Sequence, residues 1–174
     1  MMYLVPPAKP AKRKVFISYH HGEDQKWFDY FTALFGDLFA IFYDQSLDGS
    51  IRSNDPEYVN RTIREDFIDG SSITIVLCGS LTGKRKYVDW EIHSTLHRRH
   101  ALLGIALPTA VVAANGRIVV PDRLHANLQS GYAYWMQWTE DPGTLHGGIE
   151  TAIQRSANSG LIDNSQPKMT RNKS

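Results

Sequence analysis

The sequence has very little cysteine. Its 174 residues include one, Cys78, so the chain cannot form an intrachain disulfide. Disulfides are common in small secreted domains and rare in the cytosol, so the composition favours a cytoplasmic protein. Cys78 lies inside the apolar run SITIVLCGS, where we expect a small buried hydrophobic residue instead of a nucleophile.

Long apolar runs and a strong net charge are also missing. No stretch approaches the roughly 20 apolar residues of a membrane-spanning helix, so we expect no membrane partner. The net charge of +1 gives no reason to expect a nucleic-acid partner. Residues 1–13 place their basic residues after a short apolar stretch, the reverse of a signal peptide, and predict a flexible basic leader. The polar, aperiodic residues 158–174 predict a disordered tail, which leaves residues 14–157 as one domain.

Glycine motifs that bind phosphate are not present either. Gly79 and the pair Gly83-Lys84 are one residue too close together for a phosphate-binding loop. Arg85 stands where such a loop needs a serine or threonine to hold magnesium. No G-x-G-x-x-G pattern follows the first predicted strand, so a Rossmann-type dinucleotide site is not supported.

Three histidines, His93, His97 and His100, fall on one side of a predicted helix. The spacing of the first two suits a metal, but HSTLH lacks the adjacent glutamate of a metalloprotease helix. The three lie opposite the predicted apolar stripe, which favours solvated surface histidines. We therefore expect no metal.

Five apolar runs that alternate with helical patterns dominate the rest of the chain. We predict strands at residues 14–19, 40–44, 72–78, 101–108 and 132–138. Helices are predicted after a cap at Asp24, at residues 55–70 and 86–99, and after the cap and first-turn pair Asp141-Pro142. Residues 45–54 read as a polar loop, and residues 109–131 remain unassigned.

This alternation predicts an α/β fold with a doubly wound parallel sheet of five strands and right-handed crossovers. The expected strand order is the flavodoxin-like 2-1-3-4-5. In such sheets ligands bind outside the carboxyl ends of the strands. In this chain that edge follows Tyr19, Asp44 and Cys78.

One carboxylate is predicted close to that edge. In GSLTGKRKYVDWEI, residues 79–92, Glu91 and Tyr87 flank the stripe formed by Val88 and Ile92. Helix amides near the start of the helix favour the ionised carboxylate. Glu91 could accept hydrogen bonds from sugar hydroxyls and stabilise positive charge on a ribose, or it could simply be a good helix residue.

Two stretches resemble the TIR domain family. VFISYHHGED is similar to the first TIR box, and GSLTGKRKYVDWEI is similar to the later motif in which an aromatic residue precedes a glutamate by four positions. With FYD at the end of the second strand, the resemblance covers roughly residues 14–108. It is closest to the TIR-like sensor subunit of the bacterial Thoeris antiphage system.

The resemblance implies an enzyme that cleaves NAD⁺ at the nicotinamide–ribose bond. The ADP-ribose part would become a signalling nucleotide, cyclic in form, which a downstream effector protein reads in antiphage defence. Glu91 would be the catalytic carboxylate. The implied pocket residues are Phe16, Ser18, Tyr19, His20, His21, Asp44, Ser80 and Tyr87.

Other interpretations remain open. Phe16 and Tyr87 could be core aromatics, and Ser18 and Ser80 could cap turns. Tyr87 also departs from the tryptophan of many NAD⁺-cleaving TIR domains, although a tyrosine can still stack on a base. The chain could instead be a non-catalytic TIR-like adaptor that acts through homotypic assembly, or a regulator with flavodoxin topology. The histidines that follow the first strand weaken the regulator interpretation.

Trp90 and Arg98 suggest a contact surface. On the helical wheel Trp90 points away from the core, and Trp and Arg are enriched at interface hot spots. Since TIR-like proteins commonly assemble, the resemblance implies a homo-oligomer that uses this helix. Alternatively, residues 109–131 fold over Trp90.

Overall fold

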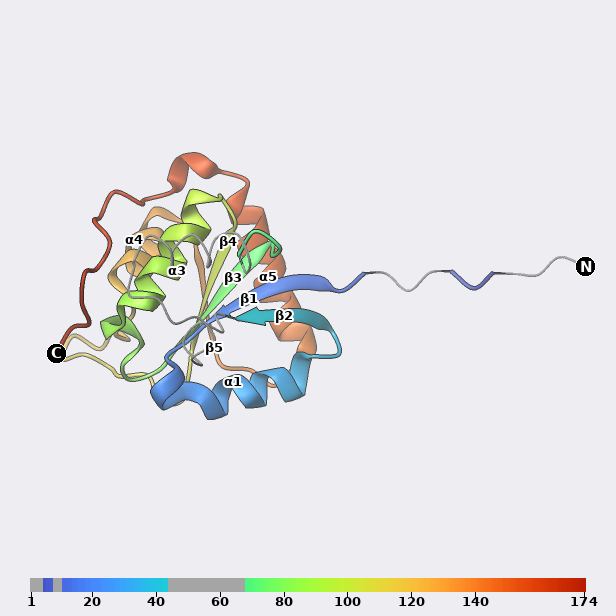
Figure 1. Ribbon diagram of the computed structural model, residues 1–174, viewed down its shortest axis with the longest axis horizontal. Coiled ribbons are helices and arrows are strands. Elements are labelled where there is room, and N and C mark those ends of the chain that lie inside the picture. The colour runs from blue at the N-terminus through green and yellow to red at the C-terminus, as the bar shows by residue number, and fades with distance from the viewer. Residues whose placement is uncertain (1–4, 8–10, 44–67) are drawn as a thin grey trace, which may run out of the picture.

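Five β-branched and aromatic runs form one parallel sheet in the computed structural model of the protein, which describes residues 5–7, 11–43 and 68–174 (Figure 1). The strands are β1 Arg13–Ser18, β2 Phe39–Tyr43, β3 Ile73–Cys78, β4 Ala101–Ala106 and β5 Tyr134–Gln137. Their order is β2-β1-β3-β4-β5 and every pairing is parallel, which confirms the predicted topology. The predicted loop at 45–54 and most of the predicted helix at 55–70 lie outside the described residues.

Helices cover both faces of the sheet. On one face, α1 His21–Phe35 and α5 Pro142–Ser156 pack against alternate residues of the central strands and form the larger apolar core. On the other face lie α3 Lys86–His97 and α4 Asp122–Ser130, over Val76, Cys78 and Leu102 (Figure 1). Cys78 is fully buried there and burial raises the pKa of its thiol, which confirms a packing role for this residue. No helix among the described residues has both the length and the apolar character to cross a bilayer.

The N-terminal caps of α1 and α5 were both predicted from the sequence, and one of the two predictions is correct. Asp141 caps α5, and its carboxylate accepts the backbone N–H of Thr144 at 2.8 Å, as the Asp-Pro pair predicts. The prediction for α1 is wrong, because the cap is His20 and not Asp24. The carbonyl of His20 accepts the N–H of Asp24, so the helix begins four residues earlier than expected.

Asp24 of α1 stabilises the turn that follows β3. Its buried carboxylate accepts the hydroxyl of Thr82, which in turn accepts the N–H of Gly79 at 2.8 Å. A Cβ atom on Gly79 would lie 2.4 Å from both carboxylate oxygens, so only glycine fits beside them. Burial raises the pKa of Asp24, and hydrogen bonds from Thr82 and Thr109 oppose that shift. The turn that leads into α3 is therefore built around a carboxylate of α1.

Two segments without a predicted fold are ordered. Residues 109–131 contain an isolated antiparallel bridge between Val112 and Ile118 and then α4. The segment 158–174, predicted to be a disordered tail, forms the short helix η4 Ser159–Leu161 and then runs along α3 and α4 (Figure 1). The flexible leader stays a prediction, since residues 1–4 and 8–10 lie outside the described residues.

Candidate functional site

Glu91 lies inside the protein at the junction of α3 and β1. Only 2% of its surface is exposed, and its Oε2 atom accepts the hydroxyl of Ser18, which is fully buried at the end of β1. The main chain at this position is fixed as well, because Thr95 donates its hydroxyl to the Glu91 carbonyl at 2.8 Å. A buried carboxylate requires such partners. The predicted catalytic glutamate therefore points inward and is oriented by Ser18, another predicted site residue.

A pocket of about 240 Å³ lies beside this pair. The pocket is lined by Tyr19, His20, His21, Gly22, Arg85, Tyr87, Val88 and Asn172. Glu91 is not itself in the wall, but Val88 and Tyr87 precede it by about one helical turn. On the strand side, Ser18 directly precedes the wall residue Tyr19. Four of the predicted pocket residues therefore meet in one wall, with the Ser18–Glu91 pair adjacent to it.

Stacked aromatic rings make one side of this pocket rigid. The Tyr19 ring lies between His21, at 4.1 Å between centroids, and Phe28, at 4.6 Å, and both pairs are nearly parallel. The Tyr19 hydroxyl donates to Gln25 at 2.9 Å. Both faces of the Tyr19 ring are covered and only 2% of its surface is exposed, so it supports the ring of His21, which is half-buried in the wall.

The other side of the pocket carries a positive charge, that of Arg85. Burial lowers the pKa of His20, and the nearby positive charge of Arg85 lowers it further. His20 is therefore neutral at pH 7, while the guanidinium of Arg85 stays charged. Tyr87 stands next to this cation, with its ring packed edge-on against Trp90 at 5.3 Å and Lys86 over its face.

Some predicted pocket residues lie elsewhere. Phe16 is fully buried in a small apolar cluster with Ile68 and Trp90, which is the core role considered as its alternative. Ser80 is half-buried in the turn after β3 and does not line this pocket. Asp44 lies outside the described residues.

The predicted exposure of Trp90 is wrong. Only 5% of its surface is exposed, and its indole N–H donates to the Met169 carbonyl at 2.7 Å. The segment that covers it is the C-terminal one, and not residues 109–131 as the alternative supposed. Arg98 is exposed and pairs with Asp69 at 3.0 Å. A contact surface that includes Arg98 remains a prediction.

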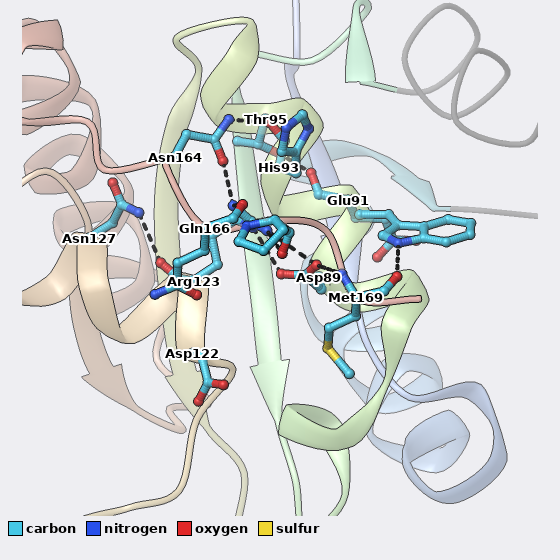
Figure 2. Close-up of polar contacts among 12 residues, drawn as sticks. Asp89, Glu91, His93, Thr95, Asp122, Arg123, Asn127, Asn164, Gln166 and Met169 are labelled. Carbon is cyan, nitrogen blue, oxygen red and sulfur yellow. Dashed lines mark hydrogen bonds and ion pairs between the residues drawn. The ribbon is translucent and has the colours of Figure 1, made fainter. Parts of the chain in front are cut away.

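Sequence reasoning missed a second buried carboxylate, Asp89, on the side of α3 that faces α4. Arg123 of α4, 1% exposed, binds Asp89 through Nε at 2.8 Å and donates to the carbonyls of Gln166 and Pro167 (Figure 2). Asp89 also accepts the N–H of Met169 at 2.8 Å. A single ion pair therefore ties together α3, α4 and the C-terminal segment. No motif marks it, because either residue alone reads as a surface charge.

The same segment contributes to the pocket. Asn172 lines it and accepts the N–H of Lys86 at 3.0 Å, while the N–H of Lys173 bonds the Lys84 carbonyl. Arg85, Val88, Gly22 and Asn172 are the wall residues that the sequence did not reveal. Asn172 could not have been found, because its position depends on the path of the whole tail.

The prediction of solvated surface histidines holds for only one of the three histidines, of which His93 and His97 lie in α3 and His100 follows it. His97 is exposed, whereas His93 and His100 are half-buried. Burial and the positive charges of Arg123 and Lys168 lower the pKa of His93 to about 4. Within the described ranges, no three His, Cys, Asp or Glu side chains gather as metal ligands would.

Comparisons with known proteins agree with the predicted resemblance. Among solved structures, the TIR domains of the activated Roq1 resistosome, which directly recognizes the pathogen effector XopQ, align with 14% identity and a TM-score of 0.39. That alignment covers 84% of this chain and 85% of the other. No curated protein matches the chain. A family model described as "Thoeris protein ThsB, TIR-like domain" matches residues 16–111, more than half of the 174 residues, and includes the end of β1 and all of α3. The chain therefore belongs to the TIR-like domain family of Thoeris protein ThsB.

Proposed function

We propose that this protein cleaves NAD⁺ at the nicotinamide–ribose bond, with Glu91 as the catalytic carboxylate. The observation that carries the proposal is the buried Ser18–Glu91 pair beside a pocket with an aromatic wall. Ser18 presents a hydroxyl to the carboxylate much as a ribose hydroxyl would.

The chemistry needs few groups. When the bond between C1′ of the ribose and the nicotinamide nitrogen breaks, both bonding electrons leave with the nitrogen, and the pyridinium becomes neutral nicotinamide. Positive charge then develops on the ribose ring. A carboxylate held in a site of low water content stabilises this charge more strongly than one in bulk water. The half-buried rings of Tyr87 and His21, which both line the pocket, can hold the flat leaving group by stacking.

The product and its use are proposed from the resemblance to the TIR-like family. A hydroxyl of the ADP-ribose part would attack C1′ in place of water and lose its proton, which yields a cyclic nucleotide. We propose that this nucleotide diffuses in the cytoplasm to a downstream effector protein in antiphage defence, and that the enzyme works as a homo-oligomer. Neither a membrane nor a nucleic acid has a part in this proposal.

Release of free nicotinamide tests the proposal. Full-length protein is incubated with NAD⁺, alone and with lysate from phage-infected cells, and nicotinamide is separated by chromatography. We expect release by the wild type that is lost in Glu91→Gln. A matched control is Glu140→Gln, which removes a surface carboxylate that bonds Tyr30 on the α1 side. If neither condition gives release and the protein is folded, the activity is excluded and a non-catalytic adaptor explains the fold.

A further inference from the structure

Arg85 is held rigidly by its main chain at the edge of the pocket. Its N–H donates to the Thr82 carbonyl at 3.3 Å, and its own carbonyl accepts the N–H of Asp89 at 3.2 Å. These bonds fix the residue between η3 Thr82–Lys84 and α3. The start of its side chain is therefore set by the fold, and Arg85 lines this pocket as well as a neighbouring one that Asp89 and Asp122 border.

The guanidinium of Arg85 has no anionic partner in the part of the chain that the structure describes. Its Nε atom is buried and makes no hydrogen bond there, and no carboxylate lies within ion-pair distance. Other arginines differ, since Arg13, Arg98 and Arg123 each pair with a carboxylate. A buried donor without an acceptor is costly, and an anionic ligand in the pocket would supply that acceptor.

The rest of the wall suits an anion. None of its eight residues is acidic. The Asn172 side chain oxygen is occupied by the Lys86 N–H, so its amide N–H₂ group is the part that a ligand could meet. Since burial and Arg85 together keep His20 neutral at pH 7, Arg85 is the one permanently charged group of the wall.

We propose that Arg85 binds the diphosphate of the dinucleotide. This inference rests on the proposed function and assigns the part of the substrate that the aromatic wall and Glu91 do not recognise. A planar guanidinium can bind phosphate oxygens through two parallel hydrogen bonds. Glu91 comes six positions after Arg85, roughly 9 Å of rise along a helix. The dinucleotide likewise places one ribose between its diphosphate and the bond to be cleaved.

The experiment measures binding without relying on turnover. ADP-ribose, which has the diphosphate but no nicotinamide, and nicotinamide riboside, which has no phosphate, are titrated by calorimetry into the full chain. We expect Arg85→Gln to weaken ADP-ribose binding about 10–100-fold and to change nicotinamide riboside binding less than about twofold. Arg85→Lys, which keeps the charge but not the planar fork, should fall between.

Lys84→Gln is the matched control, because it removes one positive charge from the adjacent residue, which does not line this pocket. It should leave both affinities unchanged. The proposal is overturned if the wild type binds no ADP-ribose at millimolar concentration, or if Arg85→Gln weakens both ligands equally. Equal weakening would mean that Arg85 only shapes the pocket, and a thermal melt of each variant shows whether its fold is intact.

The outcome is separable from that of the proposed function. ADP-ribose binding that depends on Arg85, without nicotinamide release, would keep this inference and exclude NAD⁺ cleavage. Nicotinamide release that depends on Glu91 and is unchanged in Arg85→Gln would keep the enzyme and exclude the diphosphate site.

Discussion

The two sides of α3 use buried carboxylates in different ways. Asp89 faces α4, where it is bound by the guanidinium of Arg123 and by a backbone N–H of the C-terminal segment. Glu91, two residues later, faces β1 and accepts the hydroxyl of Ser18 beside the pocket. Burial is similar, at 6% and 2% exposed surface, so burial alone does not identify a catalytic group. Their partners differ, because Asp89 pairs with a cation that holds two helices together, whereas Glu91 accepts a neutral hydroxyl about one helical turn from the pocket residues Tyr87 and Val88.

The largest expected effect on stability concerns the side of α3 that carries Asp89, which we call the structural side. Arg123→Ala leaves Asp89 buried without its cation, and we expect the free energy of unfolding to fall by about 3–5 kcal/mol, measured by urea denaturation. Replacing both Asp89 and Arg123 by leucine should cost less than Arg123→Ala alone, because no unpaired charge remains.

Lys173→Ala is the control for that experiment. It removes the surface ion pair of Lys173 with Asp122, which is worth about 1 kcal/mol or less. If Arg123→Ala destabilises the protein no more than Lys173→Ala, the ion pair with Asp89 is not what holds this side together.

On the other side, Ser18→Ala should act mainly on catalysis. Without the hydroxyl that orients Glu91, we expect nicotinamide release per folded molecule to fall about 10–100-fold, since small misplacements of a reacting group are costly. Ser71→Ala provides a comparison, because Ser71 is also buried and donates to the Ile68 carbonyl away from the pocket. Equal rates in Ser18→Ala and wild type would mean that Ser18 does not position the carboxylate.

Trp90→Phe should loosen the C-terminal segment. The change removes the hydrogen bond from the indole to Met169, worth about 0.5–1.5 kcal/mol. Trypsin should then cut after Lys168 and Arg171 several times faster, as followed by mass spectrometry. Trp27→Phe is the matched variant, because the buried indole N–H of Trp27 has no hydrogen-bond partner among the described residues. Similar cleavage of both variants would show that this bond does not hold the segment.

Acid should also weaken the structural side, by a smaller amount. The pKa of His93 is about 4 in the folded protein and 6.5 as the ordinary value, so the unfolded chain binds a proton more readily. Stability is therefore complete above pH 6.5 and decreases as the pH falls toward 4. His93→Gln should reduce that loss in melts recorded from pH 7 to pH 4. His97→Gln, on the same helix but exposed, should retain it.

The apolar part of the fold could be predicted because its spacing is regular. The strands of the sheet and the helix that carries Glu91 follow directly from such spacing and from the order of the elements. Glu91 and Ser18 were found through motifs that the family shares. The path of the C-terminal segment could not be predicted, since polar residues such as Asn164 and Asn172 become ordered only through partners far away in the sequence.

Trp90 illustrates a second limit. A helical wheel places it on the outer face of α3, but its ring packs against Phe16 of β1 and Ile68, and its indole N–H donates to Met169 of the C-terminal segment. The same contact explains why Asp89 reads as a surface charge. Local periodicity predicts which face of a helix packs on the sheet. It does not predict that residues 158–174 pack over the helix from the other side.

The most direct test of the difference between the two sides is nicotinamide release per folded molecule in Glu91→Gln and Asp89→Asn, with the phage-infected lysate present. We predict that Glu91→Gln loses about 10³-fold or more. Asp89→Asn should retain most of its activity and melt at a lower temperature. Full release by Glu91→Gln, or loss in Asp89→Asn alone, would contradict the assignment of catalysis to Glu91.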